Sequence, residues 1–295
     1  MTCRIMHDTL SRMNAVIIGV RGMLGGDLLK VCRAMPSDDA VGVDLPEVDI
    51  TDGAALGRTL PEADWIVNCA AYTRVDDAES DREAAFAVNA DGVRNVARVA
   101  AQRSTPVLHI STDYVFDGAA REPYDEGAAV HPLSVYGQSK LAGEQALIEE
   151  GGAHMIVRTQ SLFGIGGPHF VRAIARKVAQ SNDPLNVVDD QVNAPTYTRH
   201  LAVALVRLMH CRAGGVVHLS ASGACSWYDF ARAIVERIKP GHEVRPIASA
   251  ELQRPAARPA YAVLSHRRYE ALTGQRMPSW DQGLDEYLNE EESLL

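Results

Sequence analysis

A tyrosine and a lysine one helical turn apart, Tyr136 and Lys140, are suited to acid–base chemistry. Side chains four residues apart share one face of a helix, so both can reach the same ligand. A free tyrosine has a pKa of about 10 and is a poor proton donor at neutral pH. A neighbouring ammonium stabilises the phenolate and lowers that pKa. The pair predicts proton transfer to or from a bound ligand.

A glycine-rich loop is the second chemical feature. Gly19, Gly22 and Gly25 follow an apolar run, and a helical pattern begins at Met23 and Leu24. Glycines at this spacing permit a tight turn and let the backbone approach a pyrophosphate, which meets the N–H groups that open the helix. The loop therefore predicts dinucleotide binding; a purely structural turn is the alternative.

Acidic residues after the second predicted strand could bind the adenosine half of the cofactor. Asp44 lies about twenty residues beyond the glycines, where a carboxylate can bind the ribose 2′-hydroxyl, or it caps a helix or turn. No arginine directly follows Asp44 to receive a 2′-phosphate, which favours NADH over NADPH. Asp49 and Ile50 are expected beside the adenine, unless Asp49 caps the helix that begins near Asp52.

Two hydroxyl residues, Ser111 and Thr112, follow the apolar run Pro106–Ile110. Open α/β sheets bind ligands at the carboxyl ends of their strands. A hydroxyl at that edge can bind a carbonyl oxygen and align it for hydride attack, although a turn and helix cap is the alternative.

The elements that must position these groups alternate along the first half of the chain. A long amphipathic helix is expected over Arg82–Arg103. Strands alternating with helices over short loops indicate an α/β fold with a doubly wound parallel sheet of the Rossmann type. The predicted strands are Ala15–Ile18, Ala40–Val43, Trp65–Val67, Pro106–Ile110 and His154–Val157.

The alternation loosens after about residue 160. A dinucleotide-binding domain is expected over 13–160, a mainly substrate-binding region with crossing segments over 161–295, and an extension over 1–12. The stretch Glu251–Tyr261 carries two prolines and is expected to be extended. Helices are expected over Phe170–Ala179, Tyr197–His210 and Trp227–Lys239.

Composition narrows the function classes. The 295 residues carry a net charge of −9 and no basic tract, which argues against nucleic acid and anionic membranes as partners. No apolar run reaches the length of a membrane span, and no signal segment is evident, so a cytoplasmic location is expected. The five cysteines are scattered, as free thiols are, and predict neither a disulfide framework nor a metal site.

Several longer segments resemble the dTDP-4-dehydrorhamnose reductase family of extended short-chain dehydrogenases/reductases. The glycine loop, the hydroxyl pair and the Tyr/Lys helix also occur in the chain order of that superfamily. The resemblance runs from about Asn14 to Trp280. The matching segments are Asn68–Glu79, Ser111–Gly118 (STDYVFDG), Pro132–Glu144, Asp190–Thr196 and Arg258–Pro259.

The resemblance implies reduction of the 4-keto group of dTDP-6-deoxy-L-lyxo-4-hexulose to dTDP-L-rhamnose, with NADH or NADPH as cofactor. It implies that Thr112, Tyr136 and Lys140 are catalytic, and that Asn89 supports them through a helix irregularity. A nucleotide-diphosphate sugar is then the substrate, and a homodimer is left open. Residues implied beside the nicotinamide are Cys69, Ala70, Ala71 and Thr73, and those beside the substrate are Asp113, Gln191, Asn193 and Arg258.

One position departs from the family pattern. The family often carries a tryptophan in the segment that here reads Arg158-Thr-Gln-Ser-Leu-Phe-Gly164, and Ser161 stands in its place. A ring that packs on the sugar is thus absent there, so the resemblance specifies reduction more firmly than the sugar. Some family members bind Mg²⁺ at a dimer contact; Asp27 alone does not predict a metal site.

Two other functions remain alternatives. A nucleotide-sugar epimerase or dehydratase would retain NAD and return the hydride to its substrate. A non-catalytic dinucleotide-binding subunit, like the regulatory subunit of methionine adenosyltransferase, would keep the fold without turnover. The intact Thr112, Tyr136 and Lys140 favour the reductase.

Overall fold

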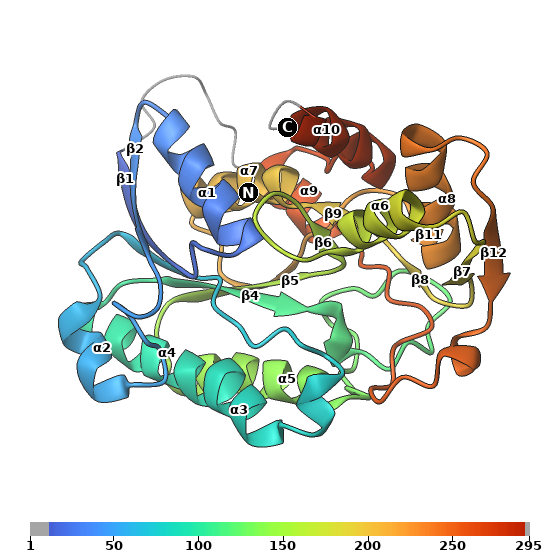
Figure 1. Cartoon of the computed structure of the whole chain (residues 1–295). Helices are drawn as coiled ribbons and strands as arrows, with labels where there is room; N and C mark the ends of the chain where they lie inside the picture. Colours follow the sequence, from blue (N-terminus) through green and yellow to red (C-terminus); the bar gives the residue numbers. More distant parts are fainter. Residues whose placement is uncertain (1–11, 293–295) are drawn as a thin grey trace.

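A six-stranded, fully parallel sheet forms the centre of the computed structural model, which describes residues 12–292 (Figure 1). The strand order is β10-β5-β4-β3-β1-β2, and the five strands expected from sequence are all present. The α/β Rossmann-type class is thereby confirmed. The strands are β1 Met13–Ile18, β2 Asp38–Val43, β3 Trp65–Asn68, β4 Val107–Thr112, β5 His154–Thr159 and β10 Gly215–His218.

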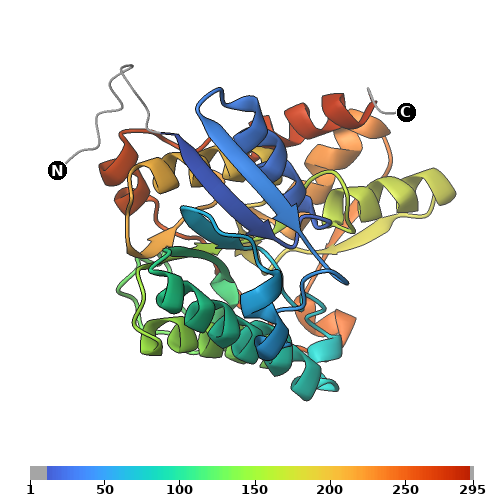
Figure 2. The ribbon, with the colours of Figure 1, turned by 90° about the vertical axis from the view of Figure 1, so that its left-hand side faces the viewer.

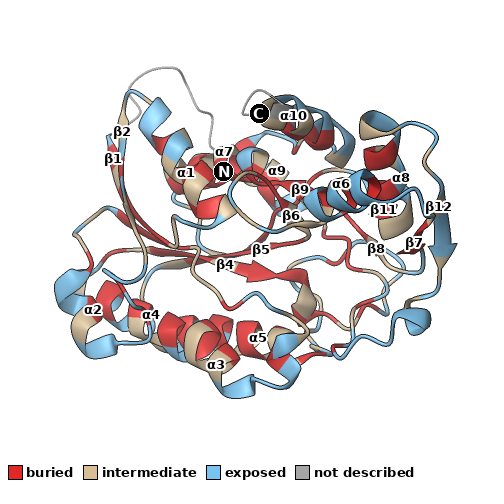
Figure 3. Ribbon diagram, viewed as in Figure 1, coloured by how far each residue is buried: buried red, intermediate tan, exposed pale blue. Residues whose placement is uncertain are grey.

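Helices cover both faces of this sheet (Figures 1 and 2). Alternate residues of β1 enter different cores: Ala15 and Ile17 pack towards one helix layer, whereas Val16 and Ile18 pack towards the other. Burial of both sheet faces explains why the strands read as continuous apolar runs (Figure 3). One layer holds α1 Met23–Ala34, α7 Thr198–His210 and α9 Arg267–Thr273; the other holds α2 Gly53–Thr59, α4 Gly92–Arg103 and α5 Val135–Glu149.

The helix expected over Arg82–Arg103 is irregular. It begins as α3 Arg82–Phe86, widens into a π-helical turn at Ala87–Asp91 and continues as α4. The buried Asn89 lies in that turn, and its amide is bonded to the backbone of Tyr72 on both sides. Single π turns inside α-helices are rare and occur frequently at functional sites.

A second lobe follows β5, with α6 Phe170–Gln180, α8 Trp227–Ile238 and α10 Trp280–Glu292 around an aromatic core (Figure 1). The helices predicted in this half are confirmed. Small sheets complete the lobe: β7 Leu185–Val188 with β12 Val244–Ile247, β6 Leu162–Phe163 with β9 Thr196–Tyr197, and β8 Val192–Asn193 with β11 Cys225–Ser226.

The expectation of an extended chain over Glu251–Tyr261 is wrong at its start. Ser249–Leu252 forms one turn of 3-10 helix, because the Glu251 carboxylate accepts a hydrogen bond from the Ala248 N–H at 2.8 Å. Such a local side-chain bond competes with extended backbone.

The chain after residue 160 does not stay in the second lobe. It returns through α7, which packs on α1, and through β10, which pairs with β5 at the edge of the central sheet. The division at residue 160 stays a prediction.

Other sequence expectations are tested only in part. Within residues 12–292, no helix is long and apolar enough to cross a membrane. Cys32, Cys69 and Cys225 are free thiols; Cys3 and most of the predicted 1–12 extension lie outside the described residues.

Candidate active site

The glycine-rich loop leaves β1 and turns into α1. Gly19 has a φ of +86°, and a Cβ there would lie 2.8 Å from the backbone nitrogen of Ala70. Only glycine allows the loop and the segment after β3 to approach so closely. Gly22 is the residue at the start of α1 and offers no side chain to cap it, so the first N–H groups of that helix suit an anionic ligand.

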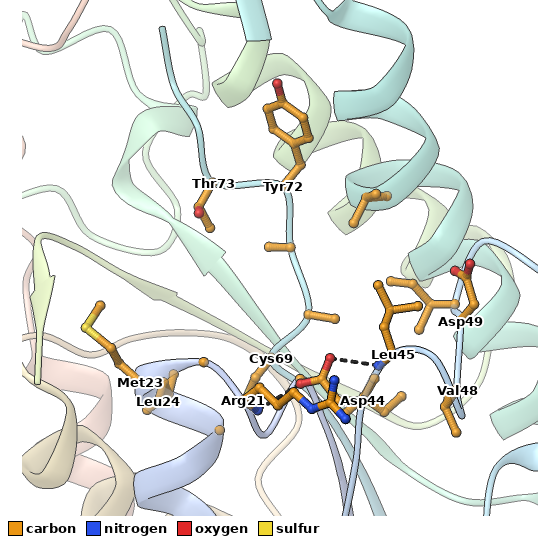
Figure 4. A pocket seen from close by; sticks show the side chains of 18 of the residues that line it. Arg21, Met23, Leu24, Asp44, Leu45, Val48, Asp49, Cys69, Tyr72 and Thr73 are labelled. Atoms are coloured by element: carbon orange, nitrogen blue, oxygen red, sulfur yellow. Dashed lines mark hydrogen bonds between the residues drawn. The ribbon is translucent and has the colours of Figure 1, made fainter. Parts of the chain in front are cut away.

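A cavity of about 610 Å³ lies between this loop and the ends of β2 and β3 (Figure 4). β1 has its successor β2 on one side and β3 on the other, so the chain reverses direction along the sheet at this point, where open α/β sheets bind nucleotides. Every predicted cofactor residue other than Tyr136 and Lys140 lines the cavity: Gly19, Gly22, Met23, Leu24, Gly25, Asp44, Asp49, Ile50, Cys69, Ala70, Ala71 and Thr73.

Asp44 is held at the rim of the cavity by the backbone. Its carboxylate accepts hydrogen bonds from the N–H groups of Arg21 and Leu45, each at 2.8 Å. The neighbouring Asp49 accepts from Thr51, whereas Asp52 is the residue that caps α2 through the N–H of Ala55. The alternative that Asp49 caps this helix is therefore wrong.

Sequence reasoning missed part of the lining. Arg21 lies beside Asp44 in Figure 4, and its exposed guanidinium is 3.7 Å from the Glu47 carboxylate. The position of Arg21 between two of the glycines could have indicated that it lines the cofactor cavity. The other missed residues are Ile18, Leu45, Val48, Thr51, Tyr72, Arg74, Val88 and Leu162.

Thr112 and Tyr136 meet where β4 ends against α5. Ser134 caps α5 by accepting a hydrogen bond from Gly137 N–H at 3.2 Å. A Cβ at Gly137 would overlap the carbonyl oxygen of Tyr114, so glycine lets the start of α5 come this close to the end of β4. The Thr112 hydroxyl beside Tyr136 lowers the tyrosine pKa, but burial dominates and raises it.

Lys140 lies on the same helix as Tyr136 and is 2% exposed. Its Nζ donates to the carbonyl oxygen of Ile110 at 2.7 Å, and burial lowers its pKa to about 8. The structure therefore brings Thr112, Tyr136 and Lys140 to the carboxyl end of one strand.

Ser111, the other predicted hydroxyl, has a structural partner. It donates to Glu144 at 2.5 Å, and the same carboxylate takes two hydrogen bonds from Arg158 at 2.9 and 2.7 Å. Both charged side chains are about 95% buried, so the pair ties α5 to β5 behind the site. Of the hydroxyl pair, only Thr112 lies beside Tyr136.

The predicted substrate residues also come together. Asp113, Gln191, Asn193 and Arg258 line a cavity of about 20 Å³. The Asn193 side chain is 4% exposed, and neither its oxygen nor its nitrogen has a hydrogen-bond partner among residues 12–292. A buried amide without partners is costly, which suits a polar ligand that would supply them.

The side chains of Asp113 and Arg258, which line this cavity, each have a hydrogen-bond partner. Burial raises the pKa of Asp113 to about 7, and its carboxylate accepts a hydrogen bond from Thr112 at 3.0 Å. Arg258 donates two hydrogen bonds to the carboxylate of Asp76, at 3.0 and 2.9 Å. The contact between Asp76 and Arg258 thus joins the segment 72–80 to the segment 253–260. Sequence reasoning missed Asp76.

Ser161 lines the same small cavity, and so does Trp227 from the start of α8. The Trp227 ring packs on Phe170, with the ring centres 4.6 Å apart. An aromatic surface therefore reaches this cavity from a different element.

The described residues do not assemble a metal site. Between residues 12 and 292, no group of three or more His, Cys, Asp or Glu side chains could hold an ion. Asp27 is instead 4% exposed and accepts a hydrogen bond from Thr198.

Comparison with known proteins extends over the same residues. A family model described as the RmlD substrate binding domain matches residues 13–293. A dTDP-4-keto-6-deoxy-D-glucose reductase of Streptomyces niveus is 40% identical over 260 residues, covering 85% of this chain and 88% of that protein. A dTDP-4-dehydrorhamnose reductase of Mycobacterium tuberculosis (strain CDC 1551 / Oshkosh) is 41% identical over 266 residues, covering 88% and 86%.

Solved structures show the same similarity. The dTDP-4-dehydrorhamnose reductase of Bacillus anthracis, crystallised in complex with NADP, superposes with a TM-score of 0.89 at 36% identity, covering 95% of this chain and 99% of that chain. A dTDP-4-dehydrorhamnose reductase of Clostridium acetobutylicum superposes with a TM-score of 0.90 at 35% identity, covering 95% and 100%.

Proposed function

The chain belongs to the RmlD family, that of the dTDP-4-dehydrorhamnose reductases, and from that premise we propose that it reduces the 4-keto group of a dTDP-linked 6-deoxy sugar. The proposed reaction converts dTDP-4-dehydrorhamnose to dTDP-L-rhamnose, with NADPH or NADH as reductant. The observation that carries this proposal is the convergence of Thr112, Tyr136 and Lys140 beside a cavity built around a glycine-rich loop.

The residues of the large cavity fit a nicotinamide dinucleotide. The opening N–H groups of α1 suit the pyrophosphate, and Asp44 keeps acceptor capacity for a ribose hydroxyl. Cys69 to Ala71 and Thr73 line the cavity beyond the loop, on the side proposed for the nicotinamide. The cofactor, when bound, supplies the hydride.

The catalytic residues divide the remaining work. Thr112 is proposed to bind the sugar carbonyl oxygen and align it, while Tyr136 donates its hydroxyl proton to the developing alkoxide. The Lys140 ammonium stabilises the phenolate left behind, since a buried phenolate without a cation is unfavourable.

The small cavity is proposed as the sugar and diphosphate side. The unpartnered Asn193 amide would bind sugar hydroxyls, and the Arg258 guanidinium suits a phosphate oxygen pair. Trp227 is proposed to supply the ring that Ser161 lacks. This cavity measures about 20 Å³, so we expect its walls to move when substrate binds.

The decisive experiment is an NADPH and NADH oxidation assay against a small panel of nucleotide-linked 4-keto-6-deoxy sugars, with product stereochemistry determined by NMR. We expect stoichiometric cofactor oxidation and a dTDP-6-deoxyhexose with a new 4-hydroxyl. Tightly retained NAD with no net oxidation would instead indicate an epimerase or dehydratase. Cofactor binding without carbonyl-dependent oxidation of any panel member would indicate a regulatory subunit.

A further inference from the structure

A fully buried histidine lies directly behind Lys140. His109, in β4, is 0% exposed, and its Nε2 lies 3.5 Å from the Lys140 Nζ. Its other ring nitrogen, Nδ1, lies 3.3 Å from the amide nitrogen of Asn68, which is also 0% exposed. None of the roles proposed above uses either residue.

The backbone fixes the direction of this chain of hydrogen bonds. Asn68 Oδ1 accepts a hydrogen bond from Ala70 N–H at 3.1 Å, so the amide nitrogen of Asn68 must face the ring. That nitrogen is a donor, and Nδ1 of His109 must therefore accept. Burial and the nearby Lys140 hold the His109 pKa well below its ordinary value, so the ring is neutral. A neutral ring that accepts at Nδ1 carries its proton on Nε2.

The Nε2–H of His109 then points at Lys140. An ammonium group is a donor only, so a charged Lys140 leaves two donors facing each other in a buried place. A neutral amine accepts the Nε2–H and still donates to the Ile110 carbonyl, which satisfies every contact. The donor pattern thus favours release of the lysine proton.

Other groups act on the same ammonium from the elements around it. Glu144, on the same helix, and Cys69, after β3, both raise the Lys140 pKa, but burial outweighs them. The Glu144 carboxylate is already bonded to Arg158 and Ser111. Much of its charge is therefore balanced by groups other than Lys140.

We propose that His109, fixed by Asn68 as the Nε2–H tautomer, is a positioning residue that makes Lys140 a ready proton donor to Tyr136 during the reduction. The inference rests on the proposed function. The tyrosine O–H bond breaks as the substrate oxygen is protonated, and the hydride that the carbonyl carbon gains would come from the reduced cofactor. A Lys140 N–H bond then breaks to restore the tyrosine, and the neutral amine accepts the His109 N–H until solvent returns the proton.

The pH dependence of kcat tests this role. Reduction requires the charged lysine, so kcat falls as the pH rises through the Lys140 pKa, about 8. His109→Phe removes the opposing N–H, stabilises the ammonium and should move this basic limb upward by about one pH unit. His109→Gln can accept from Asn68 and donate to Lys140 at once, and should restore the limb. A uniform loss of kcat in both variants, with the limb unmoved, would overturn the proposal.

Imidazole ¹⁵N NMR of the wild-type protein tests the tautomer without any variant or turnover. His109 is assigned by the signal lost in His109→Gln, or by selective labelling if that variant does not fold. We expect the Nε2–H form at pH 7, and the Nδ1–H form would overturn the inference. Absence of turnover by the wild-type enzyme on every sugar would instead overturn the proposed reduction, while the tautomer still decides the direction of the hydrogen bonds.

Discussion

The two halves of the site differ in how far they are formed before ligand binds. The cofactor side is an open cavity of about 610 Å³, whereas the sugar side measures about 20 Å³. The first is built from the ends of β1, β2 and β3, which the sheet holds in place. The second is built largely from residues 191–193 and 258–262, and one of its lining residues, Arg258, is bonded to Asp76.

This difference indicates that the two sides rearrange to different extents when their ligands bind. The cofactor side is preorganised, so binding there costs little rearrangement. On the proposed sugar side, a phosphate that binds the Arg258 guanidinium must compete with the Asp76 carboxylate bonded to it. Part of the substrate's binding energy would therefore be spent on replacing the Asp76–Arg258 contact, as in induced fit.

The largest expected effect is a loss of kcat on substitution of Tyr136, which is proposed to act between the cofactor side and the sugar side. Tyr136→Phe removes the proton donor but leaves the ring, so kcat should fall by about 10²- to 10⁴-fold. The cofactor dissociation constant, measured by fluorescence titration, should change by less than about twofold, because the Phe ring keeps the contacts of the Tyr136 ring with its neighbours. Turnover near the wild-type value would remove Tyr136 as the acid.

A smaller effect is expected at the Asp76–Arg258 contact. Arg258→Ala should raise the KM for the nucleotide sugar by about 10- to 100-fold, since charge-assisted hydrogen bonds to a diphosphate are lost. The KM for cofactor should stay unchanged. Arg254→Ala is the matched control: that side chain is 52% exposed and lies 3.9 Å from the same Asp76 carboxylate. Equal effects in both variants would show that the charge of the segment matters, not the position of Arg258.

The unpartnered side-chain amide of Asn193 allows an effect on sugar binding to be separated from an effect on protein stability. Asn193→Leu should raise the KM for the sugar by about tenfold without lowering Tm, because the replaced amide has no partner in the described protein. Asn89→Leu is the control, since the Asn89 amide makes three buried hydrogen bonds at 2.8 to 3.0 Å and should lower Tm. A Tm loss of similar size in the two variants would contradict a ligand role for Asn193.

The smallest effect concerns the choice of cofactor. Arg21→Gln should raise the KM for NADPH about fivefold and leave that for NADH unchanged, because an exposed charge contact contributes about 1 kcal/mol. The Arg21 N–H still holds Asp44 in this variant. Glu47→Gln frees the Arg21 guanidinium and should shift preference the other way. No change in the NADPH to NADH ratio would mean that Arg21 does not reach the 2′-phosphate.

The cofactor side could be predicted from sequence because its signals are local. The glycine spacing, the apolar strands and the Tyr136–Lys140 interval each lie within a few residues. The sugar side could be named only by resemblance. Its defining contact joins Asp76 to Arg258, 182 residues apart, and no local pattern marks either partner.

Contacts between distant segments also define the parts of the fold that the sequence did not predict. The strand β10 is four residues long and follows a glycine-containing turn, so its sequence does not distinguish a sheet strand from a loop. Its pairing with β5 joins Gly215 to Met155, two segments far apart in the sequence, which no local pattern marks. The π turn at Asn89 likewise depends on partners at Tyr72 and Ser139, which lie on other segments.

The return of β10 to the edge of the central sheet limits how this enzyme can be recombined with its relatives. A chimaera joined at residue 160 would receive a foreign α7 and β10, whose inner faces must match the α1 and β5 of this chain. The proposed sugar-binding region after residue 160 therefore cannot be exchanged as an independent unit at a single junction. New sugar preferences are more accessible through substitutions around β8, at 190–193, and in the segment 253–261, which leave the edge of the central sheet intact.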